Sequence, residues 1–576
     1  MSDARIIIGL DFGTTYSGAV WVHSWTPDEL VQIKEWPASR IDDRHKGSVK
    51  VPTQIRYLAN GDFEWGAQVP EDADPGEVLR LFKLALTPDL FETAMDVFRG
   101  TKRPTNVDKN ITDFMTGIFE HVCQNIRARL GADILERLPV HVVLTVPAIW
   151  REASKQRTIN AFRSIPNLPR GITTSLLSEP EAAAISASRE LDRSTFGNGN
   201  AFVVVDAGGG TVDLISYTVT SLLPVLRVHE ASEGTGDLCG SALVDIRFQE
   251  FLTARLQNDP DWNTEVLRSA RQRFENTTKR NFTLANLTVN DTFPIPVPGL
   301  ARNVDVGVTR NARFSLRASD VHMFYEPYIL KIIQLVKEQI SRSSDPIRSI
   351  ILVGGFGTST YLRERLQDAI NEDNSITTSI EILQPPNAWS AVARGAAMKG
   401  LAGARPERYD IPIVMSRTAR KHYGFECGLH FDSRIHASLA ERRYWDGLFG
   451  DWCVDAIKWF IKRGNRVSEG VAFLEPCSWS WPVGNGRSRT FPLTIYADEE
   501  SSVAPIARTE AVKALCHLTA DLGAIPDNQL DQRQGSDGRM YYHLQFDLEL
   551  VYHSASTQYT LIHKGRRYAT VEAEYV

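Results

Sequence analysis

Two carboxylates that flank a run of glycines are the side chains in this sequence best suited to phosphate chemistry. Residues 201–215 read AFVVVDAGGGTVDLI, in which the β-branched run predicts a buried strand and the glycines predict a tight turn into a second strand. Glycines 208–210 allow backbone N–H groups to converge on phosphate oxygens. Asp206 and Asp213 bracket this turn, and carboxylates beside a polyphosphate require a cation between them, so the pattern predicts Mg²⁺ held through water. Thr211 adds a hydroxyl that can orient an attacking water.

The same pattern occurs near the start of the chain. Residues 6–18 read IIIGLDFGTTYSG, where an apolar run again ends in an aspartate, Asp11, followed by a glycine and hydroxyl residues. The two aspartates lie 195 residues apart (206 − 11). Two such turns predict two related halves that close on one nucleotide, each of which contributes a carboxylate and a loop.

Strands that alternate with helices must position these turns. The sequence predicts strands at residues 54–58, 140–146 and 350–353 and helices at residues 75–88, 110–130, 152–165, 241–256, 265–280 and 320–340. Residues 176–190 are expected to run from the end of a strand into a helix with Pro180 near its first position. Ser359 is expected to cap a further helix. This alternation indicates an α/β architecture with buried sheets.

Composition and charge exclude several classes of function. The chain has 576 residues, 43% of them hydrophobic and 23% charged, which is ordinary for a globular protein of several domains. Its net charge is −6 with no strongly basic run, so neither nucleic-acid nor membrane partners are expected. No stretch predicts a signal peptide or a membrane span. The six scattered cysteines are typical of reduced thiols, which favours the cytoplasm or the nucleus.

Five segments together resemble the seventy-kilodalton heat-shock chaperones, a family within the actin-like ATPase superfamily. They are IGLDFGTTYSG, VVLTVPAIW, LSEPEAAAISA, VVVDAGGGTVDL and SIILVGGFGTSTYL, in the order and spacing of a whole nucleotide-binding domain. Any one of them alone would be weak evidence. The resemblance covers about residues 5–405 and implies a two-lobed ATPase domain made of duplicated ribonuclease-H-like halves, about residues 1–195 and 196–405, that binds ATP or ADP with Mg²⁺.

The resemblance also implies roles for individual residues. Lys83 matches the catalytic lysine that neutralises the transferred phosphoryl group, whereas on residue type alone it would be a solvated helix lysine. The other matched positions are Gly13, Thr14, Thr15 and Tyr16 for phosphate contacts; Asp11, Asp206 and Glu179 for the Mg²⁺ water shell; Thr211 and Asp213 for the attacking water; Lys279, Arg280 and Thr283 for adenosine; and Gly354 and Gly355 for the base and ribose side.

Three positions depart from the family pattern on the adenosine side. Asn276 stands where the family usually has glutamate, and Phe356 and Thr358 replace the serine and arginine that follow the paired glycines. The pair of arginines that usually encloses the adenine would keep only Arg280. These departures concern the contacts to the base and leave the phosphate chemistry unchanged.

The chain beyond residue 405 departs further from the family. The family's leucine-bearing linker and helical lid are missing, and alternating segments after residue 490 predict a β-rich domain at 406–576 for substrate or partner binding. Trp445, Trp452 and Trp459 recur every seven residues, which predicts one aromatic face of a helix or helix pair, more simply buried in a core than exposed to a ligand. The whole pattern resembles a divergent branch of the family without a lid.

The function favoured by the sequence is slow binding and hydrolysis of Mg-ATP, a weak ATPase activity, coupled to protein clients or co-chaperones. A nucleotide-sensing scaffold with little turnover is a second reading, because the GGFGT turn is altered. Phosphorylation of a small metabolite, as in kinases of the same superfamily, is a third, although no substrate pocket can be identified in the sequence.

Overall fold

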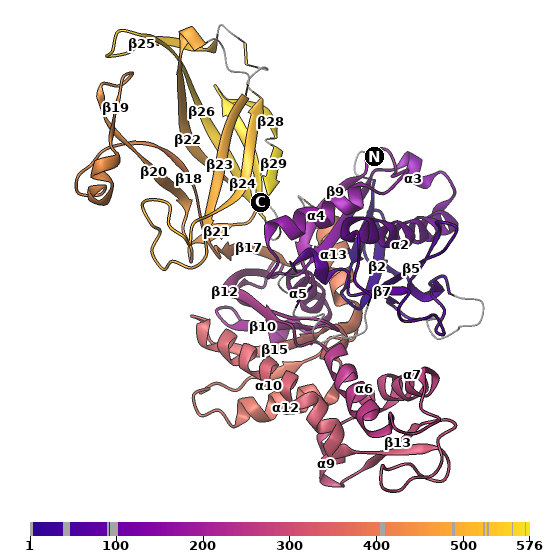
Figure 1. Cartoon of the computed structure of the whole chain (residues 1–576). Helices are drawn as coiled ribbons and strands as arrows, with labels where there is room; N and C mark the ends of the chain where they lie inside the picture. Colours follow the sequence, from indigo (N-terminus) through magenta and orange to yellow (C-terminus); the bar gives the residue numbers. More distant parts are fainter. Residues whose placement is uncertain are drawn as a thin grey trace. The chain divides into compact units, whose positions relative to one another are not determined.

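Two compact units make up the computed structural model of this chain (Figure 1), residues Met1–Ile413 and Val414–Val576. The described residues are 4–38, 47–88, 91–92, 102–403, 409–485, 490–521, 525–526, 529–553, 555, 557–570 and 572–575. The domain boundary expected at residue 405 lies outside these described residues.

The first sheet of unit 1 carries the N-terminal aspartate turn. Its strands run in the order β3 (Val31–Gln32), β2 (Tyr16–His23), β1 (Ile6–Asp11), β8 (Val140–Val146) and β9 (Thr173–Ser178), and β4 (Val51–Pro52) pairs with β2. β1 is antiparallel to β2 and parallel to β8, and β8 is parallel to β9. The strand expected at 140–146 is confirmed with the same bounds.

The second sheet of unit 1 repeats this plan. In order, β12 (Arg227–Asp237), β11 (Val212–Ser221), β10 (Ala201–Ala207), β15 (Ile347–Val353) and β16 (Glu381–Leu383) lie side by side. β10 is antiparallel to β11 and parallel to β15, which is parallel to β16. The pairing of β2, β1, β8 and β9 therefore recurs in β11, β10, β15 and β16, and this duplication confirms the expected α/β fold with two related halves.

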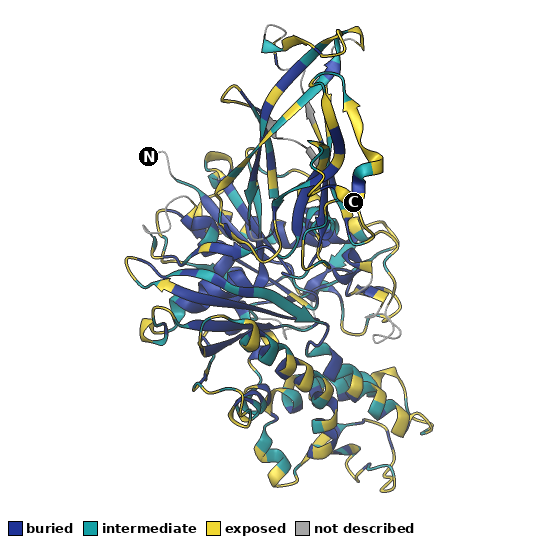
Figure 2. Cartoon of the chain, turned by 90° about the vertical axis from the view of Figure 1, so that its left-hand side faces the viewer, coloured by how far each residue is buried: buried dark blue, intermediate teal, exposed yellow. Residues whose placement is uncertain are grey.

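Helices cover these sheets and confirm most of the helical predictions. They are α2 (Val107–Leu130), α3 (Ile134–Arg137), α4 (Glu152–Arg163), α5 (Glu179–Glu190), α6 (Ala242–Leu256), α7 (Thr264–Arg273), α8 (Lys279–Asn281), α9 (Leu284–Thr288), α10 (Ala318–Arg342), α11 (Gly354–Gly357), α12 (Thr360–Asn371) and α13 (Ala391–Ala402). Figure 2 shows buried strands in this unit and helices with exposed outer faces. Ser359 caps α12 as expected, because its hydroxyl accepts from the Leu362 N–H.

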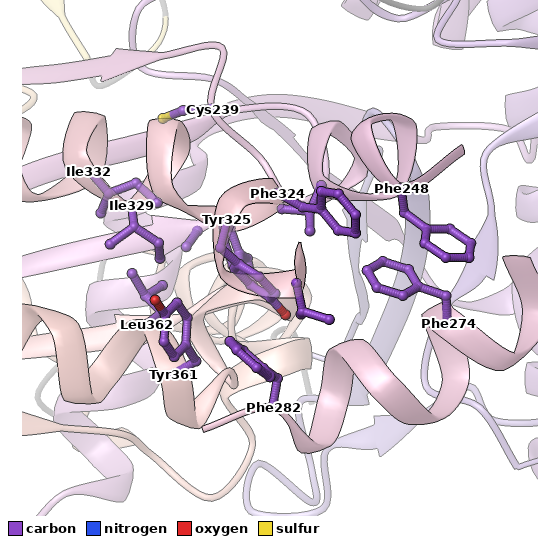
Figure 3. Packing of buried hydrophobic residues seen from close by; sticks show 14 of the residues in the cluster. Cys239, Phe248, Phe274, Phe282, Phe324, Tyr325, Ile329, Ile332, Tyr361 and Leu362 are labelled. Atoms are coloured by element: carbon purple, nitrogen blue, oxygen red, sulfur yellow. The ribbon is translucent and has the colours of Figure 1, made fainter. Parts of the chain in front are cut away.

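The core of the second half lies between the second sheet and helices α6, α7, α10 and α12. Phe248 and Phe274 stack with ring centroids 4.1 Å apart, and Tyr325 packs beside Phe282 and Tyr361 (Figure 3). The helix expected at 265–280 is interrupted by a π-helical turn at Phe274–Thr278 (η4). This core fixes the segment that continues into Lys279.

The prediction of a helix at residues 75–88 is wrong. The structure instead has strand β7 (Val78–Arg80) and a short 3₁₀ helix at Leu84–Leu86 (η2). β7 pairs with β5 (Gln54–Tyr57), which also pairs with β6 (Phe63–Trp65) in a small sheet. Leu81 has a φ of 59°, so the backbone turns sharply between the two elements. Pairing with a distant strand therefore overrides the local helical pattern.

Unit 2 is built of strands, which confirms the expected β-rich C-terminal part. One sheet has the order β19 (Tyr444–Asp446), β20 (Asp451–Ile461), β18 (His422–His430), β23 (Thr490–Asp498), β24 (Lys513–Asp521) and β29 (Glu572–Tyr575). The other has β22 (Ala472–Pro482), β26 (Met540–Tyr552), β27 (Thr557–His563) and β28 (Arg566–Thr570), with β25 (Asp531–Gln534) on β26, and β17 (Ile413–Thr418) pairs with β21 (Arg466–Ser468). Side chains of both sheets, among them Phe425 and Leu544, share one core.

The tryptophan repeat does not lie on a helix. Trp445 is in β19, whereas Trp452 and Trp459 are in β20. Trp445 and Trp452 are cross-strand partners with ring centroids 5.7 Å apart, and both are exposed. The seven-residue spacing arises from a hairpin whose turn contains Gly447 and Gly450. The expectation of a buried aromatic helix face is therefore wrong for this pair.

Two further findings bear on the sequence predictions. All six cysteines are free thiols. Among the described residues, no helix combines the length and apolar character needed to cross a bilayer.

Candidate functional site

The two aspartate turns lie against each other in unit 1. They follow equivalent strands, β1 and β10, and each returns into an antiparallel partner, β2 or β11. A Cβ added to Gly209 would lie 1.9 Å from Thr15 Oγ1, and one added to Gly210 would lie 2.7 Å from Thr14 Cγ2. Only glycine permits this approach. The structure therefore brings the two predicted phosphate turns together.

Hydrogen bonds fix the first turn. The Gly13 N–H donates to Ser17 Oγ over 3.2 Å, and the Thr53 hydroxyl donates to the Gly13 carbonyl over 2.8 Å. The Thr53 N–H donates to the Thr15 carbonyl over 2.8 Å. Tyr16 is partly exposed and packs edge-on against Trp389. The turn is thus held in one conformation by its own neighbours.

The second turn is fixed by its own backbone and by the start of helix α6. The Gly208 N–H donates to the Thr211 carbonyl over 3.0 Å. Two N–H groups at the start of the helix, from Ser241 and Ala242, donate to the carbonyls of Gly208 and Gly209. These bonds satisfy donors that a helix start otherwise leaves unpaired. Thr211 is buried at the junction of this turn with β11.

Lys83 and Glu179 form a buried ion pair beside the turns. Lys83 Nζ lies 2.6 Å from Glu179 Oε1, and the lysine side chain is 1% exposed. The ammonium also lies over the rings of Phe12 and Trp150 at 5.6 and 5.2 Å. Burial raises the pKa of Glu179 to about 7 against the opposing effect of Lys83. A solvated helix lysine, the expectation from residue type alone, is excluded for Lys83.

A second buried lysine, which the sequence analysis missed, contacts Asp11. Lys50 Nζ lies 2.7 Å from Asp11 Oδ2, and the other oxygen of this carboxylate accepts from the Thr145 hydroxyl over 3.4 Å. Burial alone would lower the pKa of Lys50, but Asp11 and more distant carboxylates raise it above its usual value. The lysine in VKVPT looks like an ordinary strand residue, so only the tertiary fold reveals it.

The second turn has carboxylates where the first has this ion pair. Asp206 and Asp213 are register partners across β10 and β11, and both are buried. Burial, followed by the negative charge of Glu179, raises the pKa of Asp206 well above its ordinary value. A cation near Asp206 would relieve this repulsion.

The charged groups at the turns fit a divalent metal ion. Asp11, Glu179, Asp206 and Asp213 oppose two lysines, which leaves two formal negative charges (4 − 2). Among the described residues, no group of three or more metal-ligating side chains is arranged to hold an ion. Carboxylate oxygens are ligands that Mg²⁺ accepts, and the excess negative charge favours a cation, so the donor set fits this ion.

The residues expected on the adenosine side lie near helix α6 and the third glycine turn. Lys279 Nζ lies 2.6 Å from Asp245 Oδ2, and the Tyr325 hydroxyl donates to the Lys279 carbonyl over 2.8 Å. Arg280 is exposed, whereas Thr283 caps α9. The cap gives Thr283 a structural role.

The third glycine turn packs onto the second. Gly354 has a φ of 82°, and a Cβ there would lie 2.5 Å from Asp206 Oδ1. Gly355 lies against Trp389. Phe356, which replaces the family's serine, is buried, and the Thr358 hydroxyl donates to the Gly355 carbonyl over 2.7 Å. Gly354 therefore lies directly beside the Asp206 carboxylate of the second turn.

Comparisons with known proteins give the site a context. Residues 106–409, more than half of the chain, match the family model described as Hsp70 protein. Heat shock 70 kDa protein 12B of Homo sapiens is 22% identical, over 81% of this chain and 77% of the relative. Heat shock 70 kDa protein 12A of Mus musculus is 23% identical, over 90% of this chain and 85% of the relative. A chaperone protein HscA homolog of Neisseria meningitidis is 24% identical, over 70% and 60%.

Proposed function

This chain belongs to the Hsp70 family of ATP-binding proteins, with its actin-like two-lobed fold, and we propose that it binds Mg-ATP at the aspartate turns and hydrolyses it slowly. The approach of these turns beside the buried Lys83–Glu179 pair carries the proposal. Both turns offer backbone N–H groups and hydroxyls, and both lie beside charged groups held away from water. Such preorganised groups are the main source of catalysis in phosphoryl transfer.

Each residue has a role in this proposal. Thr14 and Thr15 of the first turn, with glycines 208–210 of the second, hold the phosphates. Lys83 offsets the charge that develops on the transferred phosphoryl group, and Glu179 holds that ammonium in place. Thr211 and Asp213 orient the attacking water. When bound, Mg²⁺ would supply charge neutralisation between the phosphates and Asp206.

Coupling to protein partners is the second part of the proposal. Two of the relatives are named as heat shock 70 kDa proteins and the third as a chaperone protein. The β-rich unit 2 is the proposed site for clients or co-chaperones, and the cytoplasm or nucleus is the proposed location. The six free thiols support a reducing compartment.

Calorimetric ATP titration and single-turnover hydrolysis test the proposal. We expect saturable Mg-ATP binding, and a loss of at least about a hundredfold in hydrolysis rate for Lys83→Met, since this removes a charge from the transition state. Lys337→Met removes a lysine paired with Asp373 and should leave both quantities unchanged. Absence of binding would contradict the proposal, and binding without measurable hydrolysis would leave only the nucleotide-binding part. Hydrolysis with and without unfolded protein, and with small-molecule phosphate acceptors, then tests the coupling.

A further inference from the structure

A buried lysine occupies the side of the phosphate site where the sequence predicts only a metal. Lysine is almost never buried unless it is paired. The Lys50 side chain is 10% exposed and that of its partner Asp11 is 4% exposed. Lys50 also lies within electrostatic reach of Asp206 and Glu179, which raise its pKa after the opposing effect of burial. Its ammonium therefore belongs to the same cluster of charges as the expected metal carboxylates.

The backbone directs this lysine into the site. Lys50 directly precedes β4, whose residues Val51 and Pro52 pair with β2 just after the first turn. The Ser48 hydroxyl donates to the Lys50 carbonyl over 2.7 Å and fixes the approach.

A glycine opposite Asp11 leaves room for the Lys50 side chain. Gly18 is the register partner of Asp11, and a Cβ on Gly18 would lie 3.1 Å from Lys50 Cγ. The stem of the lysine thus fills the space that a side chain at position 18 would need. The position of Lys50 is therefore determined by the fold, through strand pairing, the Ser48 hydrogen bond and the absence of a side chain at Gly18.

We propose that Lys50 is a resident cation of the phosphate site, so that nucleoside di- and triphosphates bind here with only a weak requirement for a divalent metal. This inference rests on the proposed nucleotide binding at the two turns. An ammonium has three N–H donors and no acceptor. One donor is used by Asp11, which leaves donors for a phosphate oxygen at the first turn.

Charge arithmetic supports this role. Without Lys50, the site would hold four carboxylates and one lysine, three formal negative charges (4 − 1), and would repel a polyphosphate unless a divalent ion were present. Lys50 lowers this excess to two formal negative charges (4 − 2) and places its own positive charge beside the first turn, so a divalent ion has less repulsion left to offset. An ammonium is a point charge without the octahedral geometry that Mg²⁺ demands. A divalent ion would then add to binding through Asp206, while Asp11 stays paired with the lysine.

Calorimetric ATP titration in Mg²⁺ and in EDTA, on the full chain, tests the inference. For the wild type we expect affinity to fall by less than about fivefold when Mg²⁺ is removed. For Lys50→Met we expect near wild-type affinity in Mg²⁺ but a loss of about thirtyfold or more in EDTA, the scale of a charge-assisted hydrogen bond. Lys50→Arg should resemble the wild type, and Lys337→Met is the matched control.

Several outcomes overturn the inference. If the affinity of the wild type for ATP falls thirtyfold or more in EDTA, the inference is wrong. This outcome needs no variant, so it decides the question even if Lys50→Met fails to fold. If removal of Mg²⁺ by EDTA lowers the ATP affinity of Lys50→Met and of the wild type by the same factor, Lys50 has only a structural role. If Lys50→Met binds ATP more tightly than the wild type in EDTA, the lysine side chain occupies the phosphate site and competes with the nucleotide. No nucleotide binding by the wild type in either buffer would instead contradict the proposed function itself.

Discussion

The first and second phosphate turns share a backbone plan, but the residue opposite the aspartate differs between them. Both follow a buried strand that ends in aspartate, and both return antiparallel to it. Opposite Asp11 stands Gly18, which leaves room for the stem of Lys50. Opposite Asp206 stands Asp213, a second buried carboxylate. One turn is therefore neutralised from within the protein, and the other depends on a ligand for its positive charge.

This difference divides the work at the site between the two halves. A turn that has its own positive charge, from Lys50, is suited to bind phosphate whether or not a metal ion is present. A turn with paired carboxylates is suited to a cation, which their charge attracts, and to a water that attacks phosphorus, from which a carboxylate can accept a hydrogen bond or a proton. The duplication supplies two similar frames, and single side chains give each its chemistry.

The largest expected effect separates the two turns by kinetics. Thr211→Val should slow single-turnover ATP hydrolysis by about a hundredfold with little change in ATP affinity, since its hydroxyl is assigned to the attacking water. Thr14→Val in the first turn should chiefly weaken affinity. Rapid-quench hydrolysis and calorimetric titration of both variants give the two quantities. Equal losses in both quantities for Thr211→Val would assign this hydroxyl to ground-state binding.

The two aspartates give the next effect. Asp206→Asn should weaken Mg-ATP binding by up to about fivefold, the whole contribution expected of Mg²⁺, because it removes the carboxylate left to orient the hydrated metal. Asp11→Asn should cost less than about threefold, since its carboxylate is already paired with Lys50. Thermal stabilisation by Mg-ATP measures both, and each variant is first compared with the wild type without ligand. Equal loss in the two variants would mean that the metal uses both aspartates alike.

A pH effect on stability should come from the side of Glu179 and the second turn. Burial raises the pKa of Glu179 to about 7 from an ordinary 4.5, so the folded state holds a proton that the unfolded chain releases between these values. The free energy of unfolding of the nucleotide-free protein should therefore fall as pH rises through this window, by up to about 1.4 kcal/mol per pH unit.

Urea unfolding of the nucleotide-free protein between pH 5 and pH 8 measures this slope. Asp206 adds to it in the same direction, because its pKa is also raised. Glu179→Gln should flatten the slope, whereas Lys337→Met should leave it unchanged. A wild-type stability that is constant or rises over this range would show that Glu179 stays ionised in the folded protein.

Local patterns in the sequence predicted the two turns and most of the elements around them. Strands and glycines at both turns are encoded within a few residues, and the duplicated sheet confirms the inference of two halves. The expectation that Lys83 is a site residue came from the family resemblance and not from its local sequence, and its burial required the fold. The exact contacts of the adenosine-side residues, such as Lys279 with Asp245, required the fold.

The errors share one physical cause, which is pairing between distant segments. β7 was expected to be helical, but it pairs with β5. The tryptophans of β19 and β20 matched a helical period by coincidence with the length of a hairpin. Lys50 was missed because its burial depends on pairing between β4 and β2 and on the absence of a side chain at Gly18. Such contacts leave no periodic signal in a single sequence.

The smallest expected effect tests Gly18, the register partner of Asp11. In Gly18→Ala the new methyl would lie 3.1 Å from Lys50 Cγ and from the Val49 carbonyl oxygen, so the lysine stem must shift by a few tenths of an ångström. We expect ATP affinity in EDTA to fall by about threefold, with affinity in Mg²⁺ unchanged, because a displaced ammonium loses part of a charge-assisted bond. Calorimetry in both buffers measures this, and Gly47→Ala, where a Cβ meets nothing within 4 Å but φ is 80°, controls for the cost of adding a methyl nearby. An equal loss in Mg²⁺ and EDTA would mean that Gly18 supports the first turn as a whole and does not act through Lys50.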